Sequence, residues 1–315
     1  MLEQSALSLI NRLQSNMEKT IFGKPEAVQS SIITLLAKGH LLIEDVPGVG
    51  KTTLAQTLAR SIDLEFRRIQ FTNDILPSDI TGVSVYDPEA KQFIFKKGPL
   101  FSNIVLADEI NRATPRTQSA LLEAMSERQV SSDNVTHALE EPFMVIATQN
   151  PVESHGAYPL PESQMDRFMM FLSIGYPTLE DEKRLLESTL GSQAPSVESV
   201  VTREELLLLQ SQVEQVTLDE SLAEYLLALV HATRQHKHLA LGVSPRGGLT
   251  LRQAARAKAL TEGRTYCLPD DVKSMALPVF KHRVMLSSQT GSHRAQSENA
   301  AAIIMEILDQ VEIPV

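Results

Sequence analysis

The sequence is short of cysteine, with Cys267 the single one among 315 residues. One cysteine excludes an intrachain disulfide. Long hydrophobic runs are also missing, because no uninterrupted apolar stretch reaches the ~18 residues that a membrane-spanning helix needs. The N-terminus carries Glu3 and has no unbroken apolar core, which is unlike a signal peptide. These absences predict a protein of the cytoplasm without a membrane span.

Positive charge is scarce as well. The formal net charge is −10 and the sequence pI is about 5.4. This balance disfavours tight, non-specific binding to nucleic acid, because such binding depends on Lys and Arg contacts with phosphates. It does not exclude a local basic patch. The basic pairs Arg67–Arg68 and Lys96–Lys97 are interpreted as solvated faces or ion pairs.

Apolar material for a core is present, since 43% of the residues are hydrophobic and 22% are charged. Over the first half of the chain, short apolar runs alternate with helical patterns. This alternation predicts an α/β fold with a mostly parallel sheet covered by helices on both faces. The predicted strands are His40–Glu44, Phe66–Phe71, Ile104–Asp108, Phe143–Thr148 and Phe168–Ile174, and the helical patterns between them include Thr53–Ser61 and Thr114–Arg128.

The pattern changes along the chain, and the length favours two domains. Thr81–Gly98 alternates around an Asp-Pro turn and predicts a β-hairpin. Glu187–Val201 holds four serines, a Gly and a Pro, which predicts a linker. The pattern after it is helical, over residues 204–215, 218–236, 249–262 and 270–280. We therefore expect an α/β domain over residues 1–186 and a small all-α domain over residues 187–315.

The strongest local motif is Leu41–Ala59, LLIEDVPGVGKTTLAQTLA, which runs from an apolar strand through a Gly-containing turn to a helix. Phosphate binding needs this order, because the N–H groups of the turn and of the helix N-terminus face the phosphate oxygens. Lys51 would neutralise the β and γ oxygens of ATP, and Thr52 would place its hydroxyl on Mg²⁺. The predicted ATP-binding residues of this loop are Pro47, Gly48, Val49, Gly50, Lys51, Thr52 and Thr53.

Asp45 departs from the pattern G-x-x-x-x-G-K-[ST], which has a glycine at this position. A carboxylate that faced the phosphates would be repelled by them, so we expect Asp45 to point away. Gly48 and Gly50 still allow the backbone to approach the phosphates closely.

Two further strands end in polar residues. Asp108 and Glu109 follow the apolar run IVLA. A solvated strand end would explain paired acids, but the upstream phosphate loop favours a catalytic role. Asp108 is then predicted to hold Mg²⁺ through water, and Glu109 to polarise the water that attacks the γ-phosphate. Asn150, in FMVIATQNP, offers a neutral amide that would orient this water or contact the γ-phosphate.

Two arginines are candidates for contacts with ATP. Arg167 directly precedes an apolar strand, and the alternative for it is a simple pair with Asp166 or another acid. Arg246 follows Ser244 and Pro245, which suit the cap and the first position of a helix. A cation in the first helical turn opposes the helix dipole, so an anion is the favoured partner of Arg246.

Taken together, these motifs resemble the MoxR family of AAA+ ATPases. The matching stretches are Ile21–Lys24, His40–Ala55, Phe71–Gly82, Gly98–Val130, Ala147–Pro151, Gly156–Met170 and Ser244–Leu251, and they follow the expected order over nearly the whole chain. The resemblance implies that Asn150 is the sensor 1 residue and that Arg246 is the sensor 2 residue of a helical lid. It also implies that Ile21, Phe22 and Gly23 border adenine.

The same resemblance implies an assembly. Arg167 would be an arginine finger that completes the site of the neighbouring subunit, which requires a ring, usually a hexamer. The hairpin at Thr81–Gly98 resembles the helix-2 insert, which faces the central channel of related rings, and Gln129–Glu140 resembles the pre-sensor 1 hairpin. MoxR-like proteins typically work with a partner that carries a von Willebrand factor A domain.

The leading hypothesis is therefore a ring-forming ATPase that remodels or matures a client protein complex, or inserts a metal or cofactor into it. A nucleic-acid motor is the alternative, because the helix-2 insert also occurs in helicase-like ATPases and Lys91, Lys96 and Lys97 would reach phosphates there. The charge of −10 opposes this alternative. A non-hydrolysing switch or scaffold is disfavoured by Glu109, since a scaffold needs no water-polarising acid.

Overall fold

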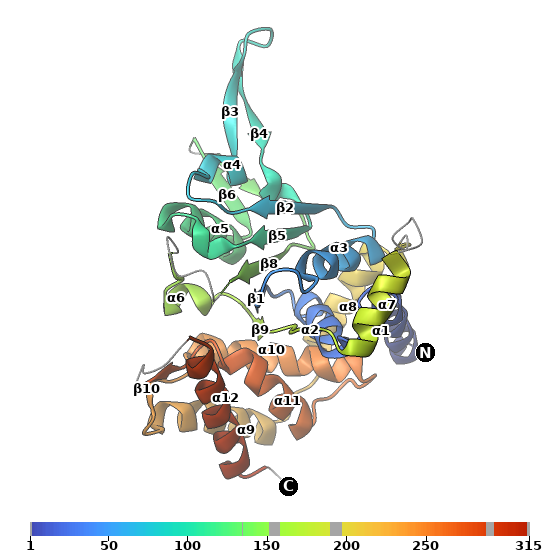
Figure 1. Cartoon of the computed structure of the whole chain (residues 1–315), viewed down its shortest axis with the longest axis vertical. Coiled ribbons are helices and arrows are strands. Elements are labelled where there is room, and N and C mark those ends of the chain that lie inside the picture. Colours follow the sequence, from blue (N-terminus) through green and yellow to red (C-terminus); the bar gives the residue numbers. More distant parts are fainter. Residues whose placement is uncertain (1, 134, 151–157, 190–196, 288–292, 314–315) are drawn as a thin grey trace.

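A five-stranded parallel sheet forms the centre of the first domain (Figure 1), in the order β2–β5–β8–β1–β9. The computed structural model describes residues 2–133, 135–150, 158–189, 197–287 and 293–313. The strands are β1 (Leu41–Glu44), β2 (Phe66–Gln70), β5 (Ile104–Asp108), β8 (Met144–Gln149) and β9 (Met170–Leu172). The predicted parallel sheet is confirmed, although β9 is shorter than the apolar run Phe168–Ile174.

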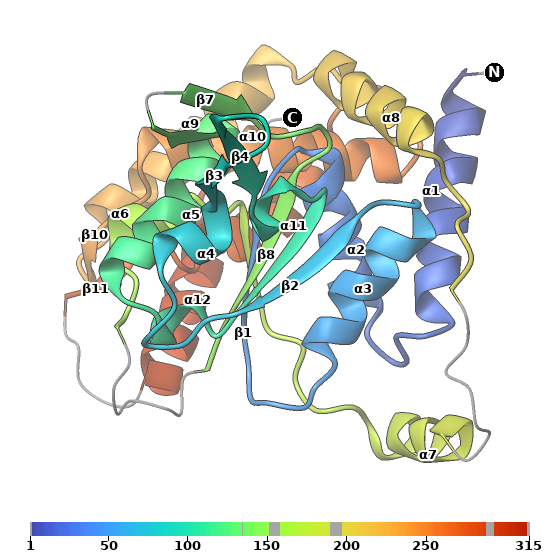
Figure 2. The same cartoon turned by 90° about the horizontal axis from the view of Figure 1, so that it is seen from above.

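Helices cover both faces of this sheet (Figure 2). One face packs against α1 (Leu2–Glu18), α2 (Pro25–Leu36) and α3 (Lys51–Ser61), and the other against α4 (Pro77–Thr81) and α5 (Pro115–Glu127). Successive strand residues point to opposite faces, so Leu41 and Ile43 belong to one buried cluster and Leu42 to the other. The inner strands β1, β5 and β8 are continuous apolar runs because both of their faces are buried, whereas β2 at the edge of the sheet exposes Arg67, Arg68 and Gln70.

Two β-hairpins stand outside this sheet, and the longer one extends past its edge strand β2 (Figure 1). The hairpin of β3 (Gly82–Asp87) and β4 (Gln92–Lys97) projects furthest from the molecule, and η1 (Pro99–Phe101) leads from it towards β5. The shorter hairpin of β6 (Gln129–Ser132) and β7 (Val135–Ala138) follows α5. The ring of Phe95 stacks on that of His137 with centroids 4.0 Å apart, so the two hairpins contact each other. The expected hairpin within Thr81–Gly98 is present.

The C-terminal part forms an all-α lid, as expected. Its helices are α8 (Arg203–Gln215), α9 (Glu220–Gln235), α10 (Pro245–Thr261), α11 (Pro269–Phe280) and α12 (His293–Gln310). The sequence patterns predicted neither α12 nor the small sheet of β10 (Leu239–Leu241) and β11 (Met285–Leu286). Helix α10 packs against α2 of the first domain as well as α8, α9 and α11, and one buried cluster therefore spans both parts. Among the helices of the described ranges, none combines the length and apolar character needed to cross a bilayer.

The segment between the two parts is partly helical. Helix α7 (Leu179–Thr189) extends into the predicted linker Glu187–Val201, which corrects the start of that linker. The acids in the first turn of α7 favour the helix through its dipole. Residues 190–196 of the predicted linker lie outside the described residues, and the division at residue 186 stays a prediction.

His40, just before β1, is buried with both ring nitrogens engaged. Its Nδ1 accepts a hydrogen bond from Val145 N–H at 3.0 Å, and its Nε2 lies 3.1 Å from the carbonyl oxygen of Met125. Burial is the main cause that lowers the pKa of His40 from 6.5 to about 4, and nearby Arg128 adds to the effect. The ring is therefore neutral in the folded protein at neutral pH.

We expect the free energy of unfolding to fall as the pH drops from about 6.5 to about 4. In that range the unfolded chain binds a proton on His40 that the folded chain does not, so stability increases with pH across it. The shift from 6.5 to about 4 corresponds to at most about 3 kcal/mol. Urea unfolding of wild type and His40→Gln at a series of pH values measures this contribution.

His40→Gln should flatten this dependence but not abolish it, because burial also lowers the pKa of His282. His231→Gln, at an exposed position of α9, controls for the exchange of histidine for glutamine. Equal pH slopes for wild type and His40→Gln would contradict the prediction.

Candidate active site

The predicted catalytic strand ends meet at one edge of the sheet. Because all five strands are parallel, β1, β5 and β8 direct their carboxyl ends to the same edge. A cavity of about 350 Å³ lies there. It is lined by Pro47, Gly48, Gly50, Lys51, Thr52, Thr53, Arg68, Asp108, Glu109 and Asn150. Four segments that are far apart in the sequence therefore contribute to one cavity.

The loop between β1 and α3 has the geometry of a phosphate cradle. Gly48 and Gly50 have φ angles of +86° and +92°, which glycine adopts without strain. A Cβ built on either glycine would meet no atom within 4 Å, so the backbone borders open space. Gly50 caps α3, whose first turn presents N–H groups at the loop. These features fit an anion held by the backbone.

Lys51, the first residue of α3, supplies a cation to this cradle. Its Nζ donates a hydrogen bond to the carbonyl oxygen of Asp45 at 2.7 Å. Burial lowers the pKa of Lys51, and the nearby carboxylates of Asp108, Asp45, Glu109 and Glu44 act in the opposite direction. The ammonium is thus held at the loop by a backbone contact, with acids around it.

The carboxylate of Asp45 is occupied by protein donors. One oxygen accepts a hydrogen bond from Gly175 N–H at 2.6 Å and lies 3.3 Å from Ser173 Oγ. The other accepts from Val46 N–H at 2.9 Å. These contacts tie the start of the loop to the chain that follows β9, as expected for a side chain that does not serve the phosphates.

The carboxylates of the two acids at the carboxyl end of β5 have separate sets of partners. Asp108 accepts hydrogen bonds from Thr148 Oγ1 at 2.5 Å and from Arg68 Nη2 at 2.6 Å. Glu109 accepts from Gln70 Nε2 at 2.8 Å and from Arg112 Nη1 at 3.0 Å. These hydrogen bonds hold both carboxylates in place at the edge of the sheet.

Glu109 also has an unusual backbone. Its φ and ψ angles of 57° and 49° lie in the left-handed region, which is uncommon for a residue other than glycine. Its N–H donates to Thr148 Oγ1 at 2.9 Å, so the same hydroxyl contacts both acids. The residue in this turn lines the cavity at the edge of the sheet.

Arg68 and Gln70 contact the acids of the site, although the sequence patterns alone do not indicate it. The pair Arg67–Arg68 was interpreted as a solvated face or an ion pair, and Arg68 does form an ion pair, but with the Asp108 of the site. The available signal was the alternation in β2, where Arg68 and Gln70 share a face at the carboxyl end of the strand. Their proximity to the acids depends on the pairing of β2 with β5.

Asn150 follows β8 and lines the same cavity, where it is 6% exposed. Residues 151–157 after it, which include Pro151 of the motif, lie outside the described residues. Asn150 thus lines one cavity together with Lys51 and Glu109, and its contact with the γ-phosphate stays a prediction.

A second cavity of about 230 Å³ adjoins the other side of the loop. Ile21, Phe22 and Val49 line it, and it shares Gly48, Gly50 and Thr53 with the first cavity. Gly23, with φ of +66°, does not line it; a Cβ there would lie 1.9 Å from Asp181 Oδ2, so the chain approaches α7 too closely for any side chain. This cavity is apolar enough to take a base next to the phosphate cradle.

Arg167 and Arg246 do not line either cavity. Nη1 of Arg167 donates to the carbonyl oxygen of Leu122 in α5 at 2.6 Å. Arg246 lies in the first turn of α10, where Ser244 accepts a hydrogen bond from Gly247 N–H. The predicted cap at Ser244 and helix start at Pro245 are therefore confirmed, whereas the two arginines stand apart from the cradle in this chain.

Comparisons with known proteins agree with this arrangement. Residues 40–170 match the model of the ATPase family associated with various cellular activities (AAA), and residues 231–307 match the AAA lid domain. The chaperone MoxR1 of Mycobacterium tuberculosis is 38% identical over 97% of this chain and 82% of its own length. The chain belongs to the MoxR family of AAA+ ATPases. It is an ATPase whose parallel sheet carries an all-α lid.

Two further relatives show how completely this MoxR-family ATPase matches others. The YeaC protein of Bacillus subtilis is 46% identical over 98% of this chain and 95% of its own length. The crystal structure of a candidate ATPase from Cytophaga hutchinsonii has a TM-score of 0.90 and 37% identity, with 99% of this chain and 97% of that chain covered. The whole chain, and not only the sheet with its phosphate loop, follows the family.

Proposed function

We propose that this MoxR-family ATPase hydrolyses ATP in the cavity between the phosphate loop and the ends of β5 and β8, and uses the energy to remodel or mature a client protein complex. The convergence of Lys51, Glu109 and Asn150 from three strand ends on one cavity carries the proposal. In this assignment the backbone of Pro47–Thr53 and the Lys51 ammonium bind the phosphates. The cavity lined by Ile21 and Phe22 takes the adenine.

Mg²⁺ fits the oxygen donors of this cavity. The Thr52 hydroxyl and the Asp108 carboxylate both line it and are hard ligands. Asp108 already accepts hydrogen bonds from Thr148 and Arg68, which favours a contact with the ion through water. When bound, the ion supplies neutralisation of the β- and γ-phosphate charge.

Glu109 is the proposed general base. It accepts a proton from a water whose oxygen attacks the γ-phosphorus, the bond to the β–γ bridging oxygen breaks, and ADP leaves. Asn150 orients that water without adding charge. In this mechanism Arg246 of the lid contacts the nucleotide of its own subunit, and Arg167 contacts that of the neighbour.

An arginine acting in trans requires a ring, which we propose to be a hexamer. In this chain Arg167 lies against α5 and outside both cavities, as a residue that serves another subunit would. We further propose that the ring works in the cytoplasm.

The projecting hairpins favour a protein client over nucleic acid. The hairpin of β3 and β4 exposes Val83, Tyr86, Phe93 and Ile94, with Phe93 72% exposed. Exposed apolar side chains in one place typically mark a protein interaction surface. We assign this hairpin as the helix-2 insert, and β6–β7 as the pre-sensor 1 hairpin that moves with it through the contact between Phe95 and His137.

We propose a partner that carries a von Willebrand factor A domain, as the resemblance to the MoxR family implies. Affinity capture with Glu109→Gln under ATP should retain this partner and the client, because the ring stays ATP-bound. Lys51→Ala under the same conditions is the matched control and should capture neither. The alternative, a nucleic-acid motor, predicts a different result. The ATPase rate would then stay unchanged with every candidate partner and increase with DNA, and salt would weaken this increase.

A further inference from the structure

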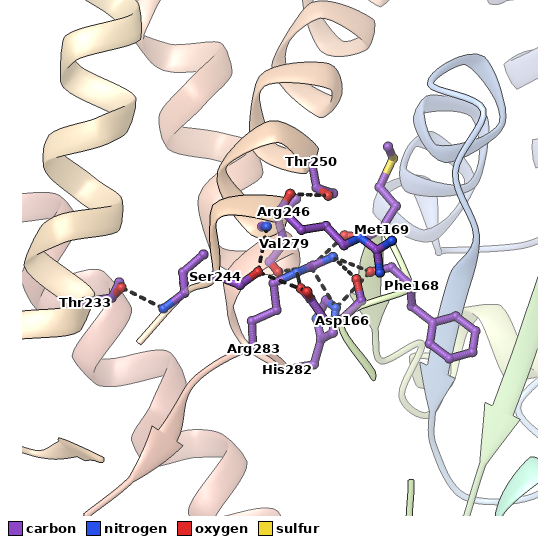
Figure 3. A network of polar contacts seen from close by, with 12 residues as sticks. Asp166, Phe168, Met169, Thr233, Ser244, Arg246, Thr250, Val279, His282 and Arg283 are labelled. Carbon is purple, nitrogen blue, oxygen red and sulfur yellow. Dashed lines mark hydrogen bonds and ion pairs between the residues drawn. The ribbon is translucent and has the colours of Figure 1, made fainter. Parts of the chain in front are cut away.

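Arg283 of the lid forms hydrogen bonds to the short segment that carries Arg167 (Figure 3). The segment Asp166–Met169 lies between α6 (Glu162–Met165) and β9. Arg283 comes from the lid, three residues after α11, and its side chain is 1% exposed. The pair that it forms with Asp166 joins residues 117 positions apart in the sequence.

The Arg283 guanidinium binds the backbone on both sides of Arg167. Its Nη2 donates to the carbonyl oxygens of Asp166 at 3.1 Å and Phe168 at 2.6 Å, and its Nη1 donates to that of Met169 at 3.1 Å. Its Nε donates to Asp166 Oδ1 at 2.7 Å. Because the guanidinium is a rigid planar fork, these bonds fix the orientation of the segment relative to the lid.

The same carboxylate reaches the start of α10. Ser244 Oγ donates to the second oxygen of Asp166 at 3.0 Å and accepts from Gly247 N–H at 3.0 Å as the cap of α10. A Cβ at Gly247 would lie 2.9 Å from Arg283 Cδ, so α10 and Arg283 are in close contact. Arg246 lies in the helical turn that this cap begins. One carboxylate thus connects the segment of Arg167 to the turn of Arg246.

We propose that Asp166, Arg283 and Ser244 form a rigid link that makes Arg167 and Arg246 move together. The proposal rests on the proposed function, in which Arg246 contacts the nucleotide of its own subunit and Arg167 that of the neighbour. The three residues are positioning residues and touch no substrate. The Arg283 side chain of this pair is 1% exposed and that of Asp166 is 19% exposed. The pair resists separation, because breaking it leaves the buried guanidinium without its counter-charge. A lid movement that follows nucleotide binding is therefore transmitted to the finger that serves the next subunit.

Mixed rings test the link in trans. Glu109→Gln subunits keep the finger but cannot hydrolyse ATP, and Arg167→Ala subunits keep the base but lack the finger. A mixture of the two should regain ATPase activity, carried by the Arg167→Ala subunits. The Glu109→Gln subunit is called the donor, because it supplies the finger to its neighbour. The test donor combines Glu109→Gln with Asp166→Asn, which keeps the shape of the Asp166 side chain and removes its charge. A second donor, Glu109→Gln with Arg283→Lys, keeps the lid cation but loses the fork.

The matched control donor is Glu109→Gln with Asp271→Asn. Asp271 forms a comparable buried pair with Arg264, with two bonds of 2.7 Å, entirely within the lid. We expect the two test donors to lower the regained kcat at least about tenfold. The KM for ATP should stay that of the control mixture, because the hydrolysing subunits have an intact link. The control donor should restore activity fully, and size-exclusion chromatography verifies equal ring assembly.

Full recovery of ATPase activity with the Asp166→Asn and Arg283→Lys donors would contradict the proposed link. It would still agree with the role of Arg167 as a finger. An equal loss with the Asp271→Asn donor would also overturn it, because the effect would then be one of lid stability. No recovery in the simple mixture would remove the trans role of Arg167, and the link with it.

Discussion

Glu109→Gln should bind ATP with nearly wild-type affinity and lose turnover by about 10²- to 10⁴-fold, the range typical of general-base removal. The glutamine amide has no basicity with which to accept the proton of the attacking water. It can still accept the hydrogen bonds that Gln70 and Arg112 donate to Glu109, so the turn should keep its conformation. The lost ion pair with Arg112 is partly exposed and worth at most about 1 kcal/mol.

Single-turnover hydrolysis of labelled ATP measures the chemical step, and titration with a fluorescent ATP analogue measures binding. Glu65→Gln is the matched control. Glu65 directly precedes β2, at the amino end of the strand, and its carboxylate contacts Arg67. That variant should hydrolyse ATP at the wild-type rate. Turnover by Glu109→Gln within twofold of wild type would show that another group activates the water.

Lys51→Ala should weaken ATP binding itself, by about 10- to 100-fold, as expected for the loss of one or two charge-assisted hydrogen bonds. The substitution removes the single ammonium that borders the phosphate cradle in the described part of the cavity. It also removes a cation that lies near Asp108, Asp45 and Glu109, so less positive charge offsets the repulsion between these acids and the phosphates. Both effects act on the ground state, so affinity falls before any catalytic step.

Arg60→Ala provides the comparison for Lys51→Ala, because it removes an exposed cation from the last turn of the same helix. Isothermal titration with ATP and with ADP should find the loss for Lys51→Ala alone, and it should be larger for ATP, which has the γ-phosphate. Unchanged ATP affinity of Lys51→Ala would contradict the phosphate-binding role of the loop.

The strands were predictable because their signal is local. A strand buried on both faces needs a continuous apolar run, as in β1, β5 and β8, and each of the five predicted strands overlaps a strand of the sheet. The helix start at Pro245 was predictable for the same reason, since a cap acts within one turn. Helix α12 was not predicted, because its hydrophobic residues are not confined to one face. Met305, for example, is exposed.

The surroundings of the catalytic acids were not predictable, because they depend on the order of the strands. Arg68 and Gln70 contact Asp108 and Glu109 only because β2 pairs with β5 at the edge of the sheet. On β2 alone, a polar pair two residues apart is equally compatible with a solvated face. Strand order results from how crossover helices pack over the whole domain, which no short stretch of sequence specifies.

The sequence by itself determined which residues make the phosphate loop, because the order strand, Gly-containing turn, Lys-Thr and helix is contiguous and each member acts on its neighbours. It also determined that the Asp45 carboxylate points away from the phosphates, because negative charges repel each other. Only the tertiary structure decided that the Asp45 carboxylate accepts a hydrogen bond from Gly175 N–H, after β9. Likewise, only the tertiary structure decided that Asp166 pairs with Arg283, 117 positions away in the sequence. Contacts of this range arise from the docking of the lid on the sheet, and that docking is set by a buried cluster to which many helices contribute at once.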